Sequence, residues 1–319
     1  MSKPDAIAKE MAAFENYFKE AVKSRVPLLD RIMRYIVNRK GKQLRPRFVL
    51  LCARLGGEIN QSTLRAASLV ELLHTATLVH DDVVDDADER RGFFSINALW
   101  KNKVAVLVGD YLLSKGLLLS LDNRDFEVLR ILSEAVKMMS EGELLQIEKT
   151  RNLNIREDVY YEIIKGKTAS LLSSACGAGA CTTFSDADKI NKLKLFGEKA
   201  GMAFQIKDDL FDYGDKDIGK PTGNDIKEKK LTLPLIYTLN NCNKELRHKI
   251  IYIIKNENTN KEKIKFVLNA VTETGGIAYA ETKMAEYRDE ALRVLKEFQP
   301  GDVRDSLEQL VLYTTDRTY

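Results

Sequence analysis

Residues 71–86 read ELLHTATLVHDDVVDD, so an apolar segment runs directly into four aspartates. The apolar residues that precede the cluster recur at the i, i+3, i+4, i+7 spacing of one helix face, namely Leu69, Leu72, Leu73 and Ala76. At about 100° per residue, Asp81 and Asp85 fall roughly 40° apart and share a face, with His74 between them in projection. Four carboxylates this close repel one another and require a compensating positive charge.

The same spacing returns in residues 201–212, which read GMAFQIKDDLFD. Here Gln205, Asp208, Asp209 and Asp212 fall on one helix face by the same arithmetic. The alternative is that each cluster is a solvated helix end, but carboxylates at a helix C-terminus oppose the helix dipole. Two such clusters favour a divalent cation, and Mg²⁺ binds carboxylates together with water and substrate phosphates. We therefore predict that the two acidic helix ends hold Mg²⁺ ions with a diphosphate between them.

Basic residues accompany both clusters. They are Lys42 and Arg45 in the turn-prone residues 41–46, Arg90 and Arg91 directly after the first cluster, Lys167 with Thr168 in residues 165–168, and Lys220 shortly after the second cluster. Each alone is typical of a solvated surface charge. Beside the acidic motifs they predict a diphosphate site, because a diphosphate needs cationic hydrogen-bond donors.

The whole chain predicts a helical, cytoplasmic protein. Its 319 residues contain only six prolines, and the apolar spacing is helical throughout, so we expect about ten helices in a single domain, residues 1–319. The 50 basic and 47 acidic residues nearly cancel, which gives no argument for a nucleic-acid partner. No apolar run reaches the ~18 residues of a membrane span. The acidic start lacks the pattern of a signal peptide, and the four cysteines form no C-x-x-C pair.

Taken together, these motifs resemble the trans-isoprenyl diphosphate synthases. The resemblance rests on GKQLRP at 41–46, His74, DDVVD at 81–85, RRG at 90–92, GKT at 166–168, FQ at 204–205, DDLFD at 208–212, GKP at 219–221 and LTLP at 231–234. It covers the chain up to residue 234. One departure is Lys229 before Lys230, where relatives often have glycine.

The resemblance implies an all-α fold around a deep central cavity, usually as a homodimer. Asp81 and Asp85 would hold two Mg²⁺ ions and Asp208 a third, supported by Asp82, Asp209 and Asp212. The allylic diphosphate would meet Arg90, Lys167, Thr168, Gln205 and Lys220, with Lys230 near the leaving group. Isopentenyl diphosphate would meet Lys42, Arg45, His74 and Arg91. Within this set, the residues we expect to carry catalysis are Asp81, Asp82, Asp85, Lys167, Asp208, Asp209 and Lys220.

The implied reaction is head-to-tail condensation. The allylic C–O bond ionises, the double bond of isopentenyl diphosphate attacks the cation, and the released diphosphate takes the proton. In this family, the residues four and five positions before the first aspartate are bulky aromatics in farnesyl-type enzymes, whereas here they are Thr77 and Ala76. The two-residue insertion of bacterial farnesyl synthases is also absent. We therefore expect a long product, a quinone side-chain precursor.

Four alternative functions are considered. A terpene cyclase would lack the second aspartate motif and the Lys42 and Arg45 site, and a regulatory subunit would lose the aspartates that this chain keeps. A short-chain synthase, or a catalytic subunit that needs an accessory partner, is harder to separate by sequence. Phe93, Phe94 and Tyr111 are expected either in the core or as stoppers of the product tunnel. Arg317 is expected either at the site entrance or in a frayed tail.

Overall fold

The computed structural model describes residues 6–38, 41–85, 87–90, 93–152, 156–214 and 222–317. Two compact units are formed. Unit 1 comprises Met1–Val136, Ser174–Lys194 and Phe298–Leu307, and unit 2 comprises Lys137–Ser173, Leu195–Glu297 and Glu308–Tyr319. Helices are found nearly throughout, as predicted, although they run from α1 to α16 and exceed the expected ten because short helices separate the long ones.

Unit 1 contains one pair of very short strands among its helices. Its elements are α1 (Ala8–Ala21), α2 (Pro27–Val37), α3 (Leu44–Gly56), α4 (Gln61–Val84), β1 (Glu89–Arg90), β2 (Phe93–Phe94), α5 (Ile96–Trp100) and α6 (Asn102–Asp122). The strands pair antiparallel, with Glu89 opposite Phe94.

Four helices have residues in both units, and the remaining elements belong to unit 2. The four are α7 (Phe126–Asn152), α9 (Ser170–Ala180), α10 (Ala187–Leu210) and α16 (Asp302–Asp316). The others are α8 (Glu157–Ile164), the π-turn η1 (Lys165–Ala169), the 3₁₀ turn η2 (Phe211–Tyr213), α11 (Asn224–Lys227), α12 (Leu233–Asn241), α13 (Lys244–Asn256), α14 (Lys261–Glu273) and α15 (Gly276–Leu295).

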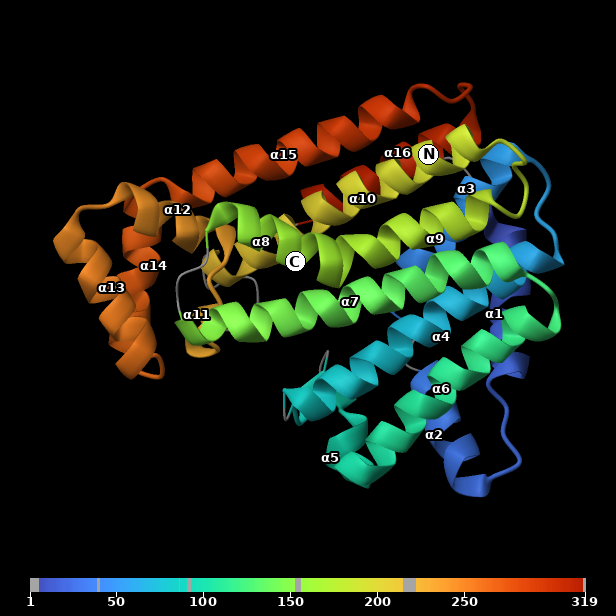
Figure 1. Cartoon of the computed structure of the whole chain (residues 1–319), viewed down its shortest axis with the longest axis horizontal. Helices are drawn as coiled ribbons and strands as arrows, with labels where there is room; N and C mark the ends of the chain where they lie inside the picture. The colour runs from blue at the N-terminus through green and yellow to red at the C-terminus, as the bar shows by residue number, and fades with distance from the viewer. Residues whose placement is uncertain are drawn as a thin grey trace. The chain divides into compact units, whose positions relative to one another are not determined.

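Helix α4 is the centre of unit 1. It begins with a capping box, in which the Asn60 side chain accepts from the Thr63 backbone N–H at 3.1 Å and the Thr63 hydroxyl accepts from the Asn60 N–H at 3.3 Å. It lies beside α6 (Figure 1) and buries its predicted apolar face. The predicted helix is confirmed, and packing of this face stabilises it, because most helical stability in proteins comes from such packing.

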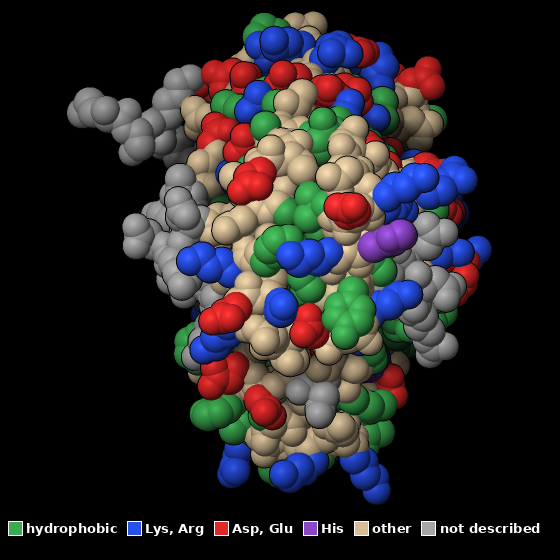
Figure 2. Space-filling model, turned by 90° about the vertical axis from the view of Figure 1, so that its left-hand side faces the viewer, with side chains coloured by type: hydrophobic (Ala, Val, Ile, Leu, Met, Phe, Trp, Pro, Cys, Tyr) green, Lys and Arg blue, Asp and Glu red, His purple; other side chains and the backbone are tan. Residues whose placement is uncertain are grey.

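The core of unit 2 is built from α8, the end of α10 and helices α12 to α15. Helix α12 begins with Pro234 in its first turn, where the missing N–H has no intrahelical partner to lose. The surface that Figure 2 turns toward the viewer carries Lys and Arg side chains intermixed with Asp and Glu. Over the described part of this surface, no large patch of one charge stands out.

Phe93 and Phe94 are not in the core. They form β2 and are 51% and 55% exposed, because a two-residue strand has no second layer to cover it. The backbone there is held instead by the Tyr35 hydroxyl, which donates to the Phe94 carbonyl at 2.7 Å.

Candidate functional site

In unit 1, the first acidic cluster forms the last turn of α4. The Asp85 backbone N–H donates to the Asp81 carbonyl at 2.8 Å, so the two aspartates are one turn apart, as the spacing predicted. Asp82 is buried, and its carbonyl accepts from the Asn97 side chain at 3.2 Å. Asp81 is half-buried and Asp85 is exposed. Asp86 lies outside the described residues.

The same helix carries three other predicted residues. His74 and Ala76 are buried, and the Thr77 hydroxyl donates to the His74 carbonyl at 2.9 Å. This bond anchors the Thr77 hydroxyl to its own helix. Ala76 and Thr77, the two positions predicted to control product length, thus both carry small side chains.

The basic residues of unit 1 are described only in part. Gln43 has a left-handed backbone (φ 47°) and begins α3, so Arg45 lies in the first helical turn instead of the preceding loop. Lys42 is exposed and Arg45 is half-buried. Arg90 contributes its backbone to β1, but its side chain, like Arg91, lies outside the described residues.

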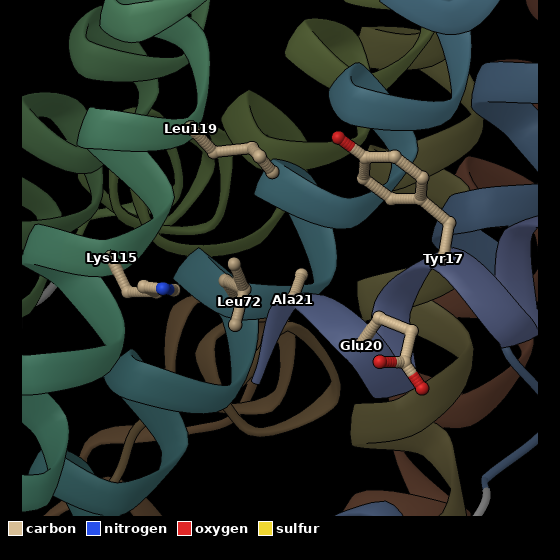
Figure 3. A pocket seen from close by; sticks show the side chains of 6 residues that line it. All are labelled: Tyr17, Glu20, Ala21, Leu72, Lys115 and Leu119. Atoms are coloured by element: carbon tan, nitrogen blue, oxygen red, sulfur yellow. The ribbon is translucent and has the colours of Figure 1, made fainter. Parts of the chain in front are cut away.

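A cavity of about 280 Å³ lies between α1, α4 and α6 of unit 1 (Figure 3). Its lining residues are Tyr17, Glu20, Ala21, Leu72, Lys115 and Leu119. Leu72 lies four residues before Ala76, one turn further from the acidic cluster on the same face of α4.

In unit 2, the second acidic cluster is organised around Asp209. Its carboxylate accepts from the Tyr160 hydroxyl at 2.7 Å and from the Gln205 amide at 2.8 Å, and the Thr168 hydroxyl donates to the Gln205 amide oxygen at 2.7 Å. Two predicted residues, Thr168 and Gln205, are thereby joined to the second motif. This chain of hydrogen bonds orients a buried carboxylate.

Burial raises the pKa of two carboxylates in this part of unit 2. Burial raises the pKa of Asp209 to about 7, against the opposing effect of the Tyr160 and Gln205 hydrogen bonds. Burial, with repulsion from Asp209 and Asp212, raises the pKa of Asp225 to about 8. Added positive charge at this place would favour the ionised forms.

These groups meet at a cavity of about 120 Å³ inside unit 2. Its polar lining includes Lys167, Thr168, Gln205, Asp209, Asp225 and Lys230. Four of the residues predicted for substrate binding thus line one hollow. Lys230 lines this cavity although Lys229 precedes it, where relatives often have glycine. The Lys230 ammonium is paired with Glu228.

Lys167 is held by an unusual backbone. It lies in the π-turn η1, a form often found at functional sites, and its ammonium is 2.5 Å from the Glu143 carboxylate. A Cβ on Gly142 would lie 2.7 Å from the backbone nitrogen of Lys167. A Cβ on Gly166 would lie 3.0 Å from the backbone carbonyl oxygen of Met138. The two glycines therefore allow α7 and η1 to approach closely enough for this ion pair.

Asp208 and Asp212 point to different partners. Asp208 forms an ion pair with Arg317. Asp212 lies beyond α10, in η2, and its carboxylate accepts from the backbone N–H groups of Asn224 at 2.8 Å and Asp225 at 3.0 Å. It therefore holds the start of α11, while Lys220 lies outside the described residues.

Sequence reasoning did not find Tyr160, Glu143 or Asp225. Tyr160 and Glu143 stand in ordinary helical segments. Only the fold brings Tyr160 beside Asp209, 49 positions away, and Glu143 beside Lys167, 24 positions away. The sequence does contain a sign of Asp225. It follows Gly223 and Asn224, which are turn-forming residues, and comes shortly after the second acidic motif.

We expect Tyr160→Phe to lower the free energy of unfolding by about 1–3 kcal/mol, because the buried Asp209 carboxylate loses a donor. Tyr161→Phe is the matched control, since its acceptor Glu157 keeps the Tyr279 hydroxyl at 2.6 Å. Urea unfolding of both variants measures the difference. If both variants lost the same free energy of unfolding, the Tyr160–Asp209 hydrogen bond would contribute no more than the Tyr161–Glu157 hydrogen bond.

Comparisons with known proteins agree with this arrangement. The polyprenyl synthetase family profile matches residues 26–271. The chain belongs to the polyprenyl synthetase family. A relative from Rhodobacter capsulatus, an all-trans-nonaprenyl-diphosphate synthase (geranyl-diphosphate specific), is 35% identical over 98% of this chain and 96% of its own.

Solved structures share the whole fold. A decaprenyl diphosphate synthase from Rhodobacter capsulatus superposes with a TM-score of 0.94 at 35% identity, covering 98% of each chain. A polyprenyl synthase from Caulobacter crescentus, complexed with calcium and isoprenyl diphosphate, has a TM-score of 0.91 at 31% identity, over 98% of this chain and 96% of the other. The fold is thus the all-α isoprenoid synthase fold, and the protein is a prenyltransferase of isoprenoid biosynthesis.

Enzymes of this family depend on Mg²⁺ in general. Among the described residues, no group of three or more His, Cys, Asp or Glu side chains could hold a metal by itself. Asp81 and Asp85, one turn apart at the end of α4, supply the carboxylate oxygens that Mg²⁺ binds together with substrate phosphates.

Proposed function

We propose that the protein condenses isopentenyl diphosphate with an allylic diphosphate and releases an all-trans, long-chain polyprenyl diphosphate, a quinone side-chain precursor. The observation that carries the long product is the pair of small side chains, Ala76 and Thr77, before the first acidic cluster. The cavity at Leu72, one turn further along α4, supports it. The alternatives are a short-chain farnesyl or geranylgeranyl synthase and a catalytic subunit of a heteromeric enzyme.

The site residues would divide the work between two diphosphates. Asp81 and Asp85 would hold two Mg²⁺ ions and Asp208 a third, with Asp82 and Asp209 keeping these carboxylates in place. Lys167, Thr168, Gln205, Arg90 and Lys220 would bind the allylic diphosphate, and Lys230 would lie near the leaving group. Lys42, Arg45, His74 and Arg91 would bind isopentenyl diphosphate. The Lys167 ammonium and the Gln205 amide are presented at one cavity, which supports their assignment.

The chemistry needs no activated nucleophile. Bound Mg²⁺ would supply the positive charge that makes diphosphate a good leaving group. Lys167 would stabilise charge growing on the leaving oxygens, and the Thr168 hydroxyl and Gln205 amide would fix its orientation. No side chain of the motifs is placed as an obvious base, so the departing diphosphate would take the proton.

We further propose a cytoplasmic homodimer in which residues 1–319 form one catalytic domain. The helices shared by both units support a single domain. The free thiols of Cys52, Cys176, Cys181 and Cys242 support a reducing compartment.

The exposed side of α6 supports pairing with a second copy. By length and composition alone α6 would pass as a membrane span, a test that core helices of soluble proteins also pass. Leu107, Leu118 and Leu121 are 61%, 49% and 49% exposed. With Tyr111 and Ser114 they follow the alternating four- and three-residue spacing of helix pairing.

We expect Leu118→Glu to shift the protein from dimer to monomer, because a charge at the centre of an apolar helix contact loses its hydration. Light scattering after size-exclusion chromatography measures the mass. Leu144→Glu, at a 67% exposed leucine of unit 2, is the matched control. A dimer that survives Leu118→Glu unchanged would contradict this interface.

The function is tested by incubating the purified chain with Mg²⁺, farnesyl diphosphate and labelled isopentenyl diphosphate, and resolving the products by length. A ladder that ends at a long polyprenyl diphosphate supports the proposal. One or two additions would favour the short-chain alternative. A folded sample that forms no product would favour a missing partner subunit.

A further inference from the structure

Arg317, one residue beyond α16, makes several contacts within unit 2. Its guanidinium pairs with the Asp208 carboxylate, and its Nε donates to the Thr314 carbonyl at 3.0 Å. The guanidinium carbon is 4.4 Å from the Phe204 ring centroid and 5.1 Å from that of Phe211. The side chain is 17% exposed, so it is not a frayed tail.

The groups around this guanidinium come from the end of α10 and the start of η2. Phe204, Asp208 and Phe211 are four and three residues apart, which puts two rings and a carboxylate on one side. A planar guanidinium suits that setting, because it stacks on aromatic faces while its N–H groups reach a carboxylate. Exposed ion pairs contribute little by themselves, but here the charge is held by four contacts.

We propose that Arg317 is a built-in counter-ion, which neutralises Asp208 in the metal-free enzyme and leaves this carboxylate when a divalent cation binds there. The inference rests on the proposed function, in which Asp208 is a metal ligand. Mg²⁺ binds carboxylate oxygen at about 2.0–2.1 Å, so a guanidinium on the same carboxylate would face a double positive charge within a few ångström. Occupation by one cation therefore disfavours the other.

The coupling works in both directions, because linkage between two ligands of one group is reciprocal. Arg317 weakens metal binding at Asp208, and metal binding releases the end of the chain that follows Thr314. The last turn of α16 would thus report whether the second acidic cluster is loaded.

The test uses Mn²⁺ as the probe and electron paramagnetic resonance to count free ions. Arg317→Met keeps an apolar side chain between the rings but removes the charge, and we expect it to bind Mn²⁺ about fivefold tighter or more. Lys207→Met is the matched control. It removes an equal charge next to Asp208, from an ammonium 5.3 Å from the Phe211 ring centroid. In the unaltered protein, Mn²⁺ should also speed amide exchange in residues 312–317.

Unchanged or weaker Mn²⁺ binding by Arg317→Met would overturn the inference, as would equal tightening by Lys207→Met, which would indicate general electrostatics. Asp208→Asn distinguishes a failure of the metal role of Asp208 from a failure of the counter-ion role of Arg317. If it binds Mn²⁺ as well as the unaltered protein, the metal assignment of the proposed function fails and the counter-ion role falls with it. If it loses Mn²⁺ while Arg317→Met shows no gain, only the counter-ion role fails.

Discussion

Replacing Asp81 or Asp208 by alanine is expected to lower kcat/KM by about 10²–10³-fold or more while the helical fold is kept. Each change removes a proposed metal ligand, and with it charge stabilisation that matters most as the diphosphate departs. Loss of one preorganised electrostatic group in an enzyme site typically has an effect of this size. Initial rates at saturating Mg²⁺, with circular dichroism of the same samples, measure activity and fold together.

The fold should tolerate both changes. Asp81 is half-buried at a helix end, and Asp208 is 37% exposed with a partner at the chain terminus. Asp208 is not part of the hydrophobic core cluster of unit 2, so its replacement leaves that core in place. Asp289→Ala, which removes a surface carboxylate paired with Arg288 on α15, is the matched control. Near-normal turnover of Asp81→Ala or Asp208→Ala in saturating Mg²⁺ would refute the metal role of that residue.

The parts of the site that lie on a single helix were predictable. The spacing of Asp81 and Asp85 on α4, and of Gln205 and Asp209 on α10, is a local property of the helix. The four-residue step from Gln205 to Asp209 reappears as a 2.8 Å hydrogen bond. Asp212 departs from the prediction because α10 ends at Leu210, and the chain then tightens into η2.

The rest depends on contacts between distant segments. The hydroxyl of Tyr160 reaches Asp209 across 49 residues, and Arg317 reaches Asp208 across 109. A pattern of local spacing carries no information about such pairs. The prediction that Phe93 and Phe94 lie in the core was wrong for the same reason. The apolar character of a residue does not say whether another element of the fold covers its side chain.

Replacing Ala76 by phenylalanine is expected to shorten the product by several isoprene units. Ala76 is only 2% exposed and lies on the same face of α4 as Leu72, which lines the cavity one turn further along the helix. A ring at this position would fill the space that the growing chain must enter, while the acidic cluster one turn away keeps its ligands. The product ladder measures the outcome, and initial rates with a short primer should change much less than product length.

A buried ring can also strain the core, at about 1–3 kcal/mol, so the thermal midpoint of each variant must accompany its ladder. Thr75→Phe is the matched control, because its side chain leaves α4 about 100° away from that of Ala76. A deeper block tests the direction of growth. Leu119→Trp, at the cavity between α1, α4 and α6, should give products longer than those of Ala76→Phe but shorter than those of the unaltered protein. An unchanged ladder in Ala76→Phe would refute the proposed path, whereas shortening by Ala76→Phe alone would mean that the chain turns away before this cavity.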